Sequence, residues 1–348
     1  MAYISFLVML RAIFFAVYLR DAMLCLCMPS CDIYDTVQKG TIFWNNDLDG
    51  DLDKEFRKMS YLLKLNIDGL TLKETRQGCG RMQNRLAVLS DGTAICIRYR
   101  ENLEQIQGEL LSYHTSKLLG LENVLEAKLL RIDEKSEFWS RLDFLDGSWD
   151  NGKLVIATKF IDDLYPVRIP DIILKQNFRL DRNTSFCGLD RRTQRFLLQW
   201  SDMVVYDFII GNFDRVVSNM FNMQWYSKSL NEPIENLLQL RNGILVFIDN
   251  EDGFSHGYRL LGRYQPYLQS LIQNLCIFRK QTVQRLEELD SLAAEALGQR
   301  LWNSVSRSYN DSRILDYIPQ ISTKNLYIFK NRISLVRGHI KECEQNKQ

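Results

Sequence analysis

The sequence predicts an α+β protein of two lobes, with a strand-rich first lobe and a helical second lobe. Two observations predict this fold class. Strand-like runs dominate residues 84–160, whereas long helical patterns follow Leu189. The length of 348 residues exceeds one average domain but suits a single two-lobed molecule with an N-terminal extension. We expect the lobes at 76–165 and 166–345, preceded by a connecting segment at 31–75.

The first lobe begins with a predicted β-hairpin. Asn84–Ser90 and Thr93–Tyr99 are strand-like runs, and Asp91-Gly92 between them supplies the positive φ angles of a two-residue turn. The elements expected after it are a helix at 103–119, strands at 128–132 and 154–160, and helices at 191–210 and 281–301. Strand, strand, helix, strand, strand and then helices is the order of the protein kinase fold, although other α+β folds share parts of it.

The composition excludes some classes of protein. Hydrophobic residues make up 46% and charged residues 25% of the chain, which is ordinary for a globular protein with a sizeable core. The 44 basic and 43 acidic side chains give a net charge of +1, without a long run of one sign. Because nucleic-acid binding needs a clustered excess of positive charge, we expect no nucleic-acid partner.

The N-terminus carries two apolar stretches, Ile4–Leu19 and Ala22–Met28. Arg11 interrupts the first stretch, at a cost of roughly 2.5–3.5 kcal/mol on membrane-insertion scales, and the surrounding apolar residues recover much of it. We expect residues 1–30 to be a membrane signal-anchor or a cleaved signal peptide. A buried helix of a soluble protein is the third interpretation.

The cysteines and histidines do not predict a zinc site. Eight cysteines occur without a C-x-x-C pair, and the chain has only three histidines. The cysteines can be reduced core residues or disulfides. Two glycosylation sequons, at Asn183 and Asn310, favour a secreted context in which disulfides form.

The acidic segment 45–53 superficially suggests a calcium-binding loop. An EF-hand beginning at Asp47 needs Gly at its sixth position and Glu at its twelfth, where the sequence has Leu52 and Lys58. We therefore expect a solvated turn or the start of a helix.

The most specific local motif lies at Gly211–Asn219, directly after a predicted long helix. It places Asn219 five residues after Asp214. Protein kinases use this spacing in their catalytic loop, where the Asp accepts the proton of the substrate hydroxyl and the Asn coordinates a metal ion. The residues before Asp214 are Asn212-Phe213 instead of the usual His-Arg. An Asp and an Asn at this spacing also occur by chance.

A second acidic motif follows the buried strand run Leu245–Ile248. Asp249 stands just past this strand, where kinases place a metal-binding Asp that bridges the ion to the phosphates of ATP. An acidic surface turn is the alternative interpretation. We expect Met220–Trp225 and Gly243–Ile248 to form the intervening hairpin, with a loop at 227–242 that is longer than in ordinary kinases.

The first lobe offers candidates for nucleotide binding. Gly78 and Gly80 precede a predicted strand and suit a loop whose backbone approaches phosphates, although the third glycine of the kinase pattern is missing. Arg98 stands where kinases place a phosphate-pairing Lys, and Glu109 lies eleven residues later in the predicted helix. Arg keeps the charge of Lys but presents a planar fork. A surface Arg and an unrelated Glu are the alternative.

Together these motifs resemble the Four-jointed family over roughly residues 40–340. The stretch before Gly40 matches nothing that we can align. The segments that carry the resemblance are Gly78–Arg85, Asp91–Thr93, Gln105–Glu109, Trp200–Asp202, Asn212–Arg215, Ser218-Asn219 and Asp249–Glu251.

The resemblance implies a Golgi-lumenal, single-pass type II membrane protein related to the atypical kinases of the secretory pathway. The insect founder of the family phosphorylates Ser or Thr in cadherin repeats of Fat and Dachsous cadherins, which act in planar polarity and growth control, and secreted forms are described. The implied cofactors are ATP with Mn²⁺ or Mg²⁺. Two rival interpretations remain, a pseudokinase and a secreted signalling ligand released from the membrane.

The resemblance also implies roles for individual residues. Asp214 becomes the catalytic base and Asp249 the metal-binding carboxylate, with Asn219 matching the metal-binding Asn by spacing. Arg98 and Glu109 align with the Lys–Glu pair of the wider kinase clan. Lumenal placement makes disulfides expected, and the plausible pairs are Cys79 with Cys96 and Cys187 with Cys276.

Overall fold

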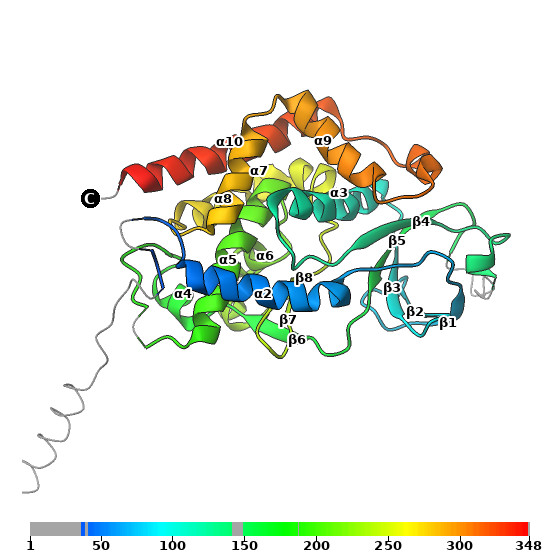
Figure 1. Cartoon of the computed structure of the whole chain (residues 1–348), viewed down its shortest axis with the longest axis horizontal. Helices are drawn as coiled ribbons and strands as arrows, with labels where there is room; N and C mark the ends of the chain where they lie inside the picture. The colour runs from blue at the N-terminus through cyan, green and yellow to red at the C-terminus, as the bar shows by residue number, and fades with distance from the viewer. Residues whose placement is uncertain (1–35, 39–40, 141–148, 187, 347–348) are drawn as a thin grey trace, which may run out of the picture.

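The computed structural model describes residues 36–38, 41–140, 149–186 and 188–346 (Figure 1). The expected signal-anchor at residues 1–30 lies outside these ranges. Within the described part of the chain, no helix combines the length and the apolar character needed to cross a membrane.

A five-stranded antiparallel sheet forms the first lobe, in the order β1-β2-β3-β5-β4. The predicted hairpin is confirmed, because Arg85 pairs with Ile97 and Val88 with Ala94, and Gly92 in the turn has a φ of 90°. The helix expected at 103–119 is α3 (Leu103–Leu119). The five strands are β1 (Leu72–Arg76), β2 (Arg85–Leu89), β3 (Ala94–Tyr99), β4 (Ala127–Arg131) and β5 (Leu154–Lys159).

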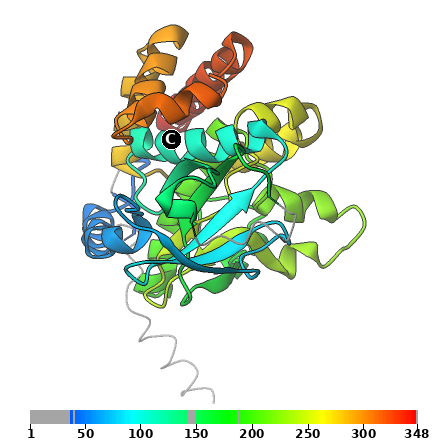
Figure 2. The same ribbon diagram turned by 90° about the vertical axis from the view of Figure 1, so that its right-hand side faces the viewer.

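Both faces of this sheet are covered. Side chains alternate along β5, so that Leu154 and Ile156 join the main core of the molecule. Val155 and Ala157 join a smaller core on the opposite face, which includes Trp149. Figures 1 and 2 show the sheet beneath α3, with α9 and α10 lying above that helix.

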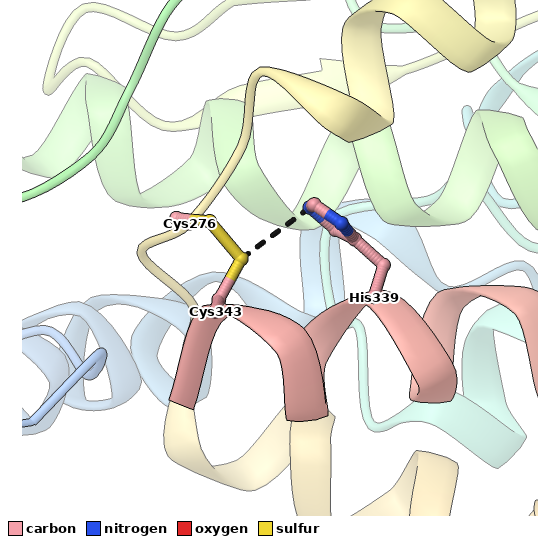
Figure 3. A group of neighbouring side chains, drawn as sticks. All are labelled: Cys276, His339 and Cys343. Atoms are coloured by element: carbon pink, nitrogen blue, oxygen red, sulfur yellow. Dashed lines mark hydrogen bonds between the residues drawn. A yellow bond between two sulfur atoms is a disulfide. The ribbon is translucent and has the colours of Figure 1, made fainter. Parts of the chain in front are cut away.

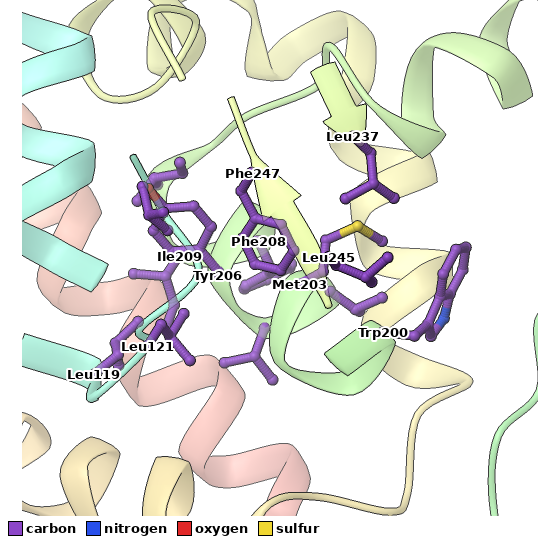
Figure 4. Packing of buried hydrophobic residues seen from close by; sticks show 14 of the residues in the cluster. Leu119, Leu121, Trp200, Met203, Tyr206, Phe208, Ile209, Leu237, Leu245 and Phe247 are labelled. Carbon is purple, nitrogen blue, oxygen red and sulfur yellow. The ribbon is translucent and has the colours of Figure 1, made fainter. Parts of the chain in front are cut away.

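The second lobe is built around α5 (Arg191–Ile210), which confirms the helix expected there. Asp190 caps its N-terminus by accepting a hydrogen bond from the Thr193 amide, and Gly211 ends it with a φ of 76°. Figure 4 shows how tightly its apolar side chains pack against the neighbouring strands. The labelled residues of that core are Leu119, Leu121, Trp200, Met203, Tyr206, Phe208, Ile209, Leu237, Leu245 and Phe247.

The other elements of this lobe are a small sheet in the order β6-β7-β8 and a set of surrounding helices. They are α4 (Asp171–Lys175), β6 (Tyr165–Arg168), α6 (Val216–Asn222), β7 (Pro233–Gln239), β8 (Leu245–Phe247), α7 (Ser255–Gln273), α8 (Lys280–Asp290), α9 (Ala294–Ser306) and α10 (Thr323–Gln345).

The hairpin expected from Met220–Trp225 and Gly243–Ile248 is wrong. Most of the first segment belongs to α6 or the turn after it, and β8 pairs instead with β7, where Leu237 lies opposite Phe247. Val216 and Val217 form the buried first turn of α6. The long connection therefore precedes β7 and does not form the tip of the hairpin.

The single helix expected at 281–301 is two helices, α8 and α9. The chain is extended at Ala293, with a ψ of 157°, and this residue caps α9. Buried Leu286 and Leu289 on α8 and Leu297 and Leu301 on α9 continue the same apolar spacing across the break. That continuity explains why the sequence pattern indicates one helix.

The segment 31–75, expected to connect the N-terminus to the lobes, contains structured elements. Helix α2 (Asn46–Leu63) buries five apolar residues, and β1 is an edge strand of the first sheet. The expected helix start in the acidic segment is confirmed, with Asn45 as its cap. Buried Arg279 forms ion pairs with Asp49 and Asp53 of α2 and so fixes this helix to the second lobe.

Candidate active site

Three charged side chains from separate elements meet between the lobes. The Nη1 atom of Arg98, on β3, lies 3.3 Å from Oε2 of Glu109 on α3 and 3.3 Å from Oδ1 of Asp249, just past β8. Arg98 and Glu109 are 6% and 2% exposed, so the alternative of unrelated surface residues is wrong. Burial raises the pKa of Glu109 to about 7, although Arg98 opposes the shift.

The contact atoms of this triad lack hydrogen-bond partners among the described residues. Within the described part of the chain, Nη1 of Arg98, Oε2 of Glu109 and Oδ1 of Asp249 are buried and make no hydrogen bond, only the longer ion-pair contacts. Buried polar atoms normally have hydrogen-bond partners. Asp249 also adopts a left-handed backbone conformation with a φ of 52°, which is strained for a residue other than glycine. These features are typical of a site completed by a ligand.

Asp214 is held in the loop after α5. Its backbone amide donates to Oδ1 of Asn212 at 3.1 Å, and its Oδ2 accepts a hydrogen bond of 2.8 Å from the side chain of Asn236 on β7. Burial raises the pKa of Asp214 to about 7, and the nearby carboxylates of Asp252, Glu235 and Asp249 add to the shift. Asp249 is thus one of the charges that act on Asp214, and the contacts of Arg215 join the loops that carry the two aspartates.

Arg215 joins the two acidic loops. Its buried guanidinium pairs with Asp207 on α5 and with the side-chain oxygen of Asn250, and it also donates to the carbonyls of Ile248 at 3.2 Å and Asn236 at 3.1 Å. Burial raises the pKa of Asp207 to about 6, against the effect of Arg215. This arginine therefore fixes the position of Asp214 relative to Asp249. The sequence alone does not indicate this role of Arg215, although Arg215 is part of the Asn212–Arg215 motif.

Glu251 connects the same centre to the glycine-containing loop. It accepts a hydrogen bond from Arg100 at 2.5 Å, pairs with Arg81 at 3.1 Å and accepts another from Gln105 at 3.2 Å. Arg100 donates to Asn84 at 2.7 Å, and Asn84 donates to the Cys79 carbonyl at 2.8 Å. The loop is thereby held over the site through side chains from both lobes.

The glycine loop is also covalently attached to β3. Cys79 and Cys96 form the expected disulfide, with Cα atoms 5.8 Å apart. Gly78 and Gly80 have φ angles of 139° and 93°, conformations that other residues rarely adopt. Their contact with phosphate groups stays a prediction.

Asn219 makes no direct contact with Asp214 or Asp249 among the described residues, and its metal-binding role stays a prediction. It lies in α6, and its side-chain amide donates to the carbonyl of Ser229 at 2.7 Å. Neither a hydrogen bond nor an ion pair links it to Asp214 or Asp249 in the part of the chain that the structure describes. The side chain that contacts Asp214 is instead Asn236, a residue that sequence spacing did not indicate because β7 was not predicted.

A close backbone contact presses α3 against the loop after β8. A Cβ atom at Gly108 would lie 2.5 Å from the carbonyl oxygen of Glu251 and 2.7 Å from that of Gly253. Glu109, the next residue, depends on this approach for its distance to Arg98 and Asp249. The close contact therefore explains on steric grounds why the Gln105–Glu109 motif has glycine at position 108.

Replacing Gly108 by alanine is expected to destabilise the fold by about 1–3 kcal/mol, because backbone atoms must move to admit the methyl group. Gly262, in the middle of α7, has no atom near its Cβ position, so Gly262→Ala is the matched control and is expected to stabilise by about 0.5–1 kcal/mol. Urea denaturation measures both changes. Equal changes in the free energy of unfolding for the two substitutions would contradict the close contact at Gly108.

The expected pair Cys187 with Cys276 is wrong, because Cys276 forms a disulfide with Cys343 near the end of α10 (Figure 3). Cys187 lies outside the described residues. His339 is beside this disulfide, with Nε2 3.4 Å from the sulfur of Cys343 and 2.8 Å from the Leu275 carbonyl. Because both sulfurs are bonded to each other, they are not thiolate ligands for a metal.

Replacing Cys343 by serine removes this second disulfide and is expected to lower the free energy of unfolding by roughly 4 kcal/mol. In the chain-entropy treatment the loss is this large because the disulfide closes a loop with a sequence separation of 67. Mass spectrometry of peptides from the unreduced protein is expected to find Cys276 linked to Cys343. A peptide linking Cys187 to Cys276 would contradict the structure.

The side chains of Asn183 and Asn310 are exposed, as acceptors of a glycan must be. The amide of Asn310 donates to Asp68 at 3.1 Å, a contact that a glycan would replace. Glycosylation at both positions stays a prediction.

Comparisons with known proteins identify the family. The model of the Four-jointed box protein middle domain matches residues 62–346. The chain is 31% identical to the extracellular serine/threonine protein kinase four-jointed of Drosophila melanogaster, over 87% of this chain and 60% of the relative. It is 32% identical to Four-jointed box protein 1 of Mus musculus, over 88% of this chain and 69% of the relative. The chain thus spans about 60% of the length of the fly relative.

A solved structure supports the same fold. The crystal structure of the Golgi casein kinase with Mn/ADP bound is similar with a TM-score of 0.51 at 13% sequence identity, covering 84% of this chain and 76% of that one. The expected architecture is therefore confirmed as a two-lobed atypical kinase fold with a strand-rich first lobe and a helical second lobe. On the family match and the identities to its relatives, the chain belongs to the Four-jointed box family.

Proposed function

We propose that this protein is a kinase of the secretory pathway that transfers the γ-phosphoryl group of ATP to Ser or Thr hydroxyls of extracellular protein domains. The observation that carries the proposal is the contact of buried Arg98 with Glu109 and with half-buried Asp249. Arg215 joins the Asp249 loop to the loop that carries half-buried Asp214. The name of the fly relative, an extracellular serine/threonine protein kinase, supports the choice of acceptor.

Asp214 is the proposed base. Asn236 binds its Oδ2, whereas its Oδ1 accepts no hydrogen bond from the described residues and is free to receive the proton of an acceptor hydroxyl. The side-chain hydrogen bond and the Asn212 contact hold the carboxylate in one orientation before the substrate binds. Such positioning supplies much of the catalysis in phosphoryl transfer.

Asp249 and Glu109 are the residues that would hold a divalent cation, Mn²⁺ or Mg²⁺. The fit rests on Oδ1 of Asp249 and Oε2 of Glu109, which accept no hydrogen bond from the described residues and contact only Arg98 there, at 3.3 Å, and on the oxygen-only character of the donor set. When bound, the cation neutralises charge on the β- and γ-phosphates. Arg98 supports the same phosphates with a guanidinium that keeps its charge at every physiological pH. The Golgi casein kinase, whose crystal structure contains Mn/ADP, supports this choice of cofactors.

The proposed substrates are cadherin repeats of Fat and Dachsous-type cadherins, met in the Golgi lumen or outside the cell. Family membership supports this substrate class, and the two disulfides support an oxidising compartment. An N-terminal signal-anchor that holds the protein on the lumenal side of the Golgi membrane is part of the proposal. Degenerate kinases commonly lose a catalytic or metal-binding acid, and this chain retains both Asp214 and Asp249, which favours an active enzyme over a pseudokinase.

The test is incubation of the purified protein with isolated cadherin repeats and ATP in Mn²⁺, followed by mass spectrometry of the repeats. We expect phosphate on Ser or Thr, and we expect removal of the metal with EDTA to abolish it. Repeats that carry no phosphate after incubation with a folded, disulfide-bonded protein would favour a pseudokinase or a signalling ligand.

A further inference from the structure

A hollow of about 290 Å³ lies between α6 and the start of β7. Two short connections join it to Asp214. Helix α6 begins two residues after Asp214, and Glu235 in the wall of the hollow directly precedes Asn236, which binds Asp214. These connections place the hollow near the loop of Asp214, where an acceptor hydroxyl would bind. The sequence singles out the long connection before β7, and the proposed chemistry gives it no role.

The wall of the hollow offers hydrogen-bond acceptors to a ligand. Glu232 and Glu235 are its charged residues, and both are exposed. Glu232 accepts a hydrogen bond of 2.8 Å from the hydroxyl of Tyr226, whereas Glu235 has neither a hydrogen bond nor an ion pair within the described residues. Two carboxylates without a cationic partner form a surface that favours positive charge.

A buried polar side chain adds a third acceptor. Asn219 lines the hollow and is 5% exposed. Its amide nitrogen donates to the Ser229 carbonyl, and its side-chain oxygen accepts no hydrogen bond from the residues that the structure describes. This oxygen is therefore available to accept a hydrogen bond from a donor supplied by a ligand.

An exposed aromatic side chain completes the hollow. Trp225 is 67% exposed, which is unusual for tryptophan. Its ring makes an edge contact with the ring of Phe221, and the two ring centroids are 4.9 Å apart. An exposed indole face attracts guanidinium and ammonium groups through its quadrupole. The apolar stem of a lysine or arginine would also pack on this ring.

We propose that this hollow binds a lysine or arginine side chain close to the phosphorylated residue of the protein substrate, and so selects acceptor sites with a flanking positive charge. The inference rests on the proposed kinase function for its biological meaning. It identifies Glu235, Glu232, Asn219 and Trp225 as specificity-determining residues. The chemistry fits a donor-rich cation, because carboxylates and a carbonyl oxygen all accept hydrogen bonds.

The first experiment measures binding by fluorescence anisotropy of labelled serine peptides to the full-length protein with Mn²⁺ and ADP. Three peptides carry arginine, alanine or glutamate at the positions that flank the serine. We expect the arginine peptide to bind about fivefold or more tightly than the alanine peptide, and the glutamate peptide to bind most weakly. Equal affinities for all three peptides would overturn the inference.

Variants then locate the effect. Glu235→Gln is expected to remove most of the preference for arginine, and Glu235→Lys to reverse it toward the glutamate peptide. Glu74→Gln is the matched control, since Glu74 is an exposed glutamate on β1 without a hydrogen bond or ion pair to any described residue. It is expected to keep the preference. Trp225→Ala is compared with Tyr61→Ala, which removes another aromatic residue that is 67% exposed. Loss of preference in the controls but not in the variants would contradict the site.

Binding and phosphoryl transfer are scored separately, so that the two proposals can fail independently. Charge-dependent peptide binding without any transfer would sustain the recognition site and contradict the kinase function. Transfer to all three peptides with equal kcat/KM would sustain the kinase function and contradict the recognition site.

Discussion

Replacing Asp249 by alanine is expected to lower the rate of phosphoryl transfer by about 10³-fold or more, because it removes the carboxylate that would place the cation against the phosphates. The fold is expected to survive, since Arg98 keeps its ion pair with Glu109. The measurement is kcat for transfer from ATP in saturating Mn²⁺, together with a thermal melt of the same sample.

A matched control for this change is Asp162→Ala. Asp162 is an exposed aspartate that follows a different strand, β5, and it forms no hydrogen bond or ion pair with the described residues. It is expected to leave kcat unchanged. An Asp249→Ala protein that retains more than about a tenth of the normal rate would show that Asp249 is not essential to metal binding.

Replacing Arg215 by alanine is expected to reduce the free energy of unfolding by about 3–5 kcal/mol. The substitution leaves Asp207 buried without its cationic partner and removes the donors to Asn250, Ile248 and Asn236. Because these contacts join the Asp214 loop to the Asp249 loop, activity is expected to fall as well. Urea denaturation followed by circular dichroism measures the change in stability.

The comparison for this prediction is an exposed ion pair. Arg259 pairs with Glu104 at 2.6 Å on the surface, so Arg259→Ala is expected to cost less than about 1 kcal/mol. In the double variant Asp207→Asn/Arg215→Ala, the loss is expected to be smaller than the sum of the single losses, because no buried carboxylate remains. A loss below 1 kcal/mol in Arg215→Ala alone would contradict the role of the buried arginine.

Local signals in the sequence predicted the parts of the fold that they determine directly. Asp91-Gly92 specified the first hairpin, and Asp190 and Gly211 mark the ends of α5 where the helix was expected. The strand β7 was missed because its buried residues, Ile234 and Leu237, do not follow a simple alternation, and its backbone is left-handed at Asn236. Its place depends on pairing with β8, which is information that the local sequence does not contain.

In the candidate site too, local sequence predicted some residues, whereas others depend on contacts between distant parts of the chain. Spacing along the chain indicated Arg98, Glu109, Asp214 and Asp249, and the structure brings the first, second and fourth of these into direct contact. Arg215 was not given its role, because its partner Asn250 is 35 residues away along the chain. Asn219 matched the spacing of a metal ligand, but the helix α6 directs its amide to Ser229. The partner of Cys276 likewise depends on how α10 packs, which cysteine spacing does not reveal.

The central claim is that Asp214 is the base of a phosphoryl-transfer centre that Asp249 completes. The most direct test is the rate of transfer to an acceptor peptide by Asp214→Asn, measured beside its affinity for ADP and Mn²⁺. We predict that nucleotide affinity stays within about twofold of the unmodified protein while transfer falls by about 10²-fold or more. Transfer by Asp214→Asn at the normal rate would contradict the claim.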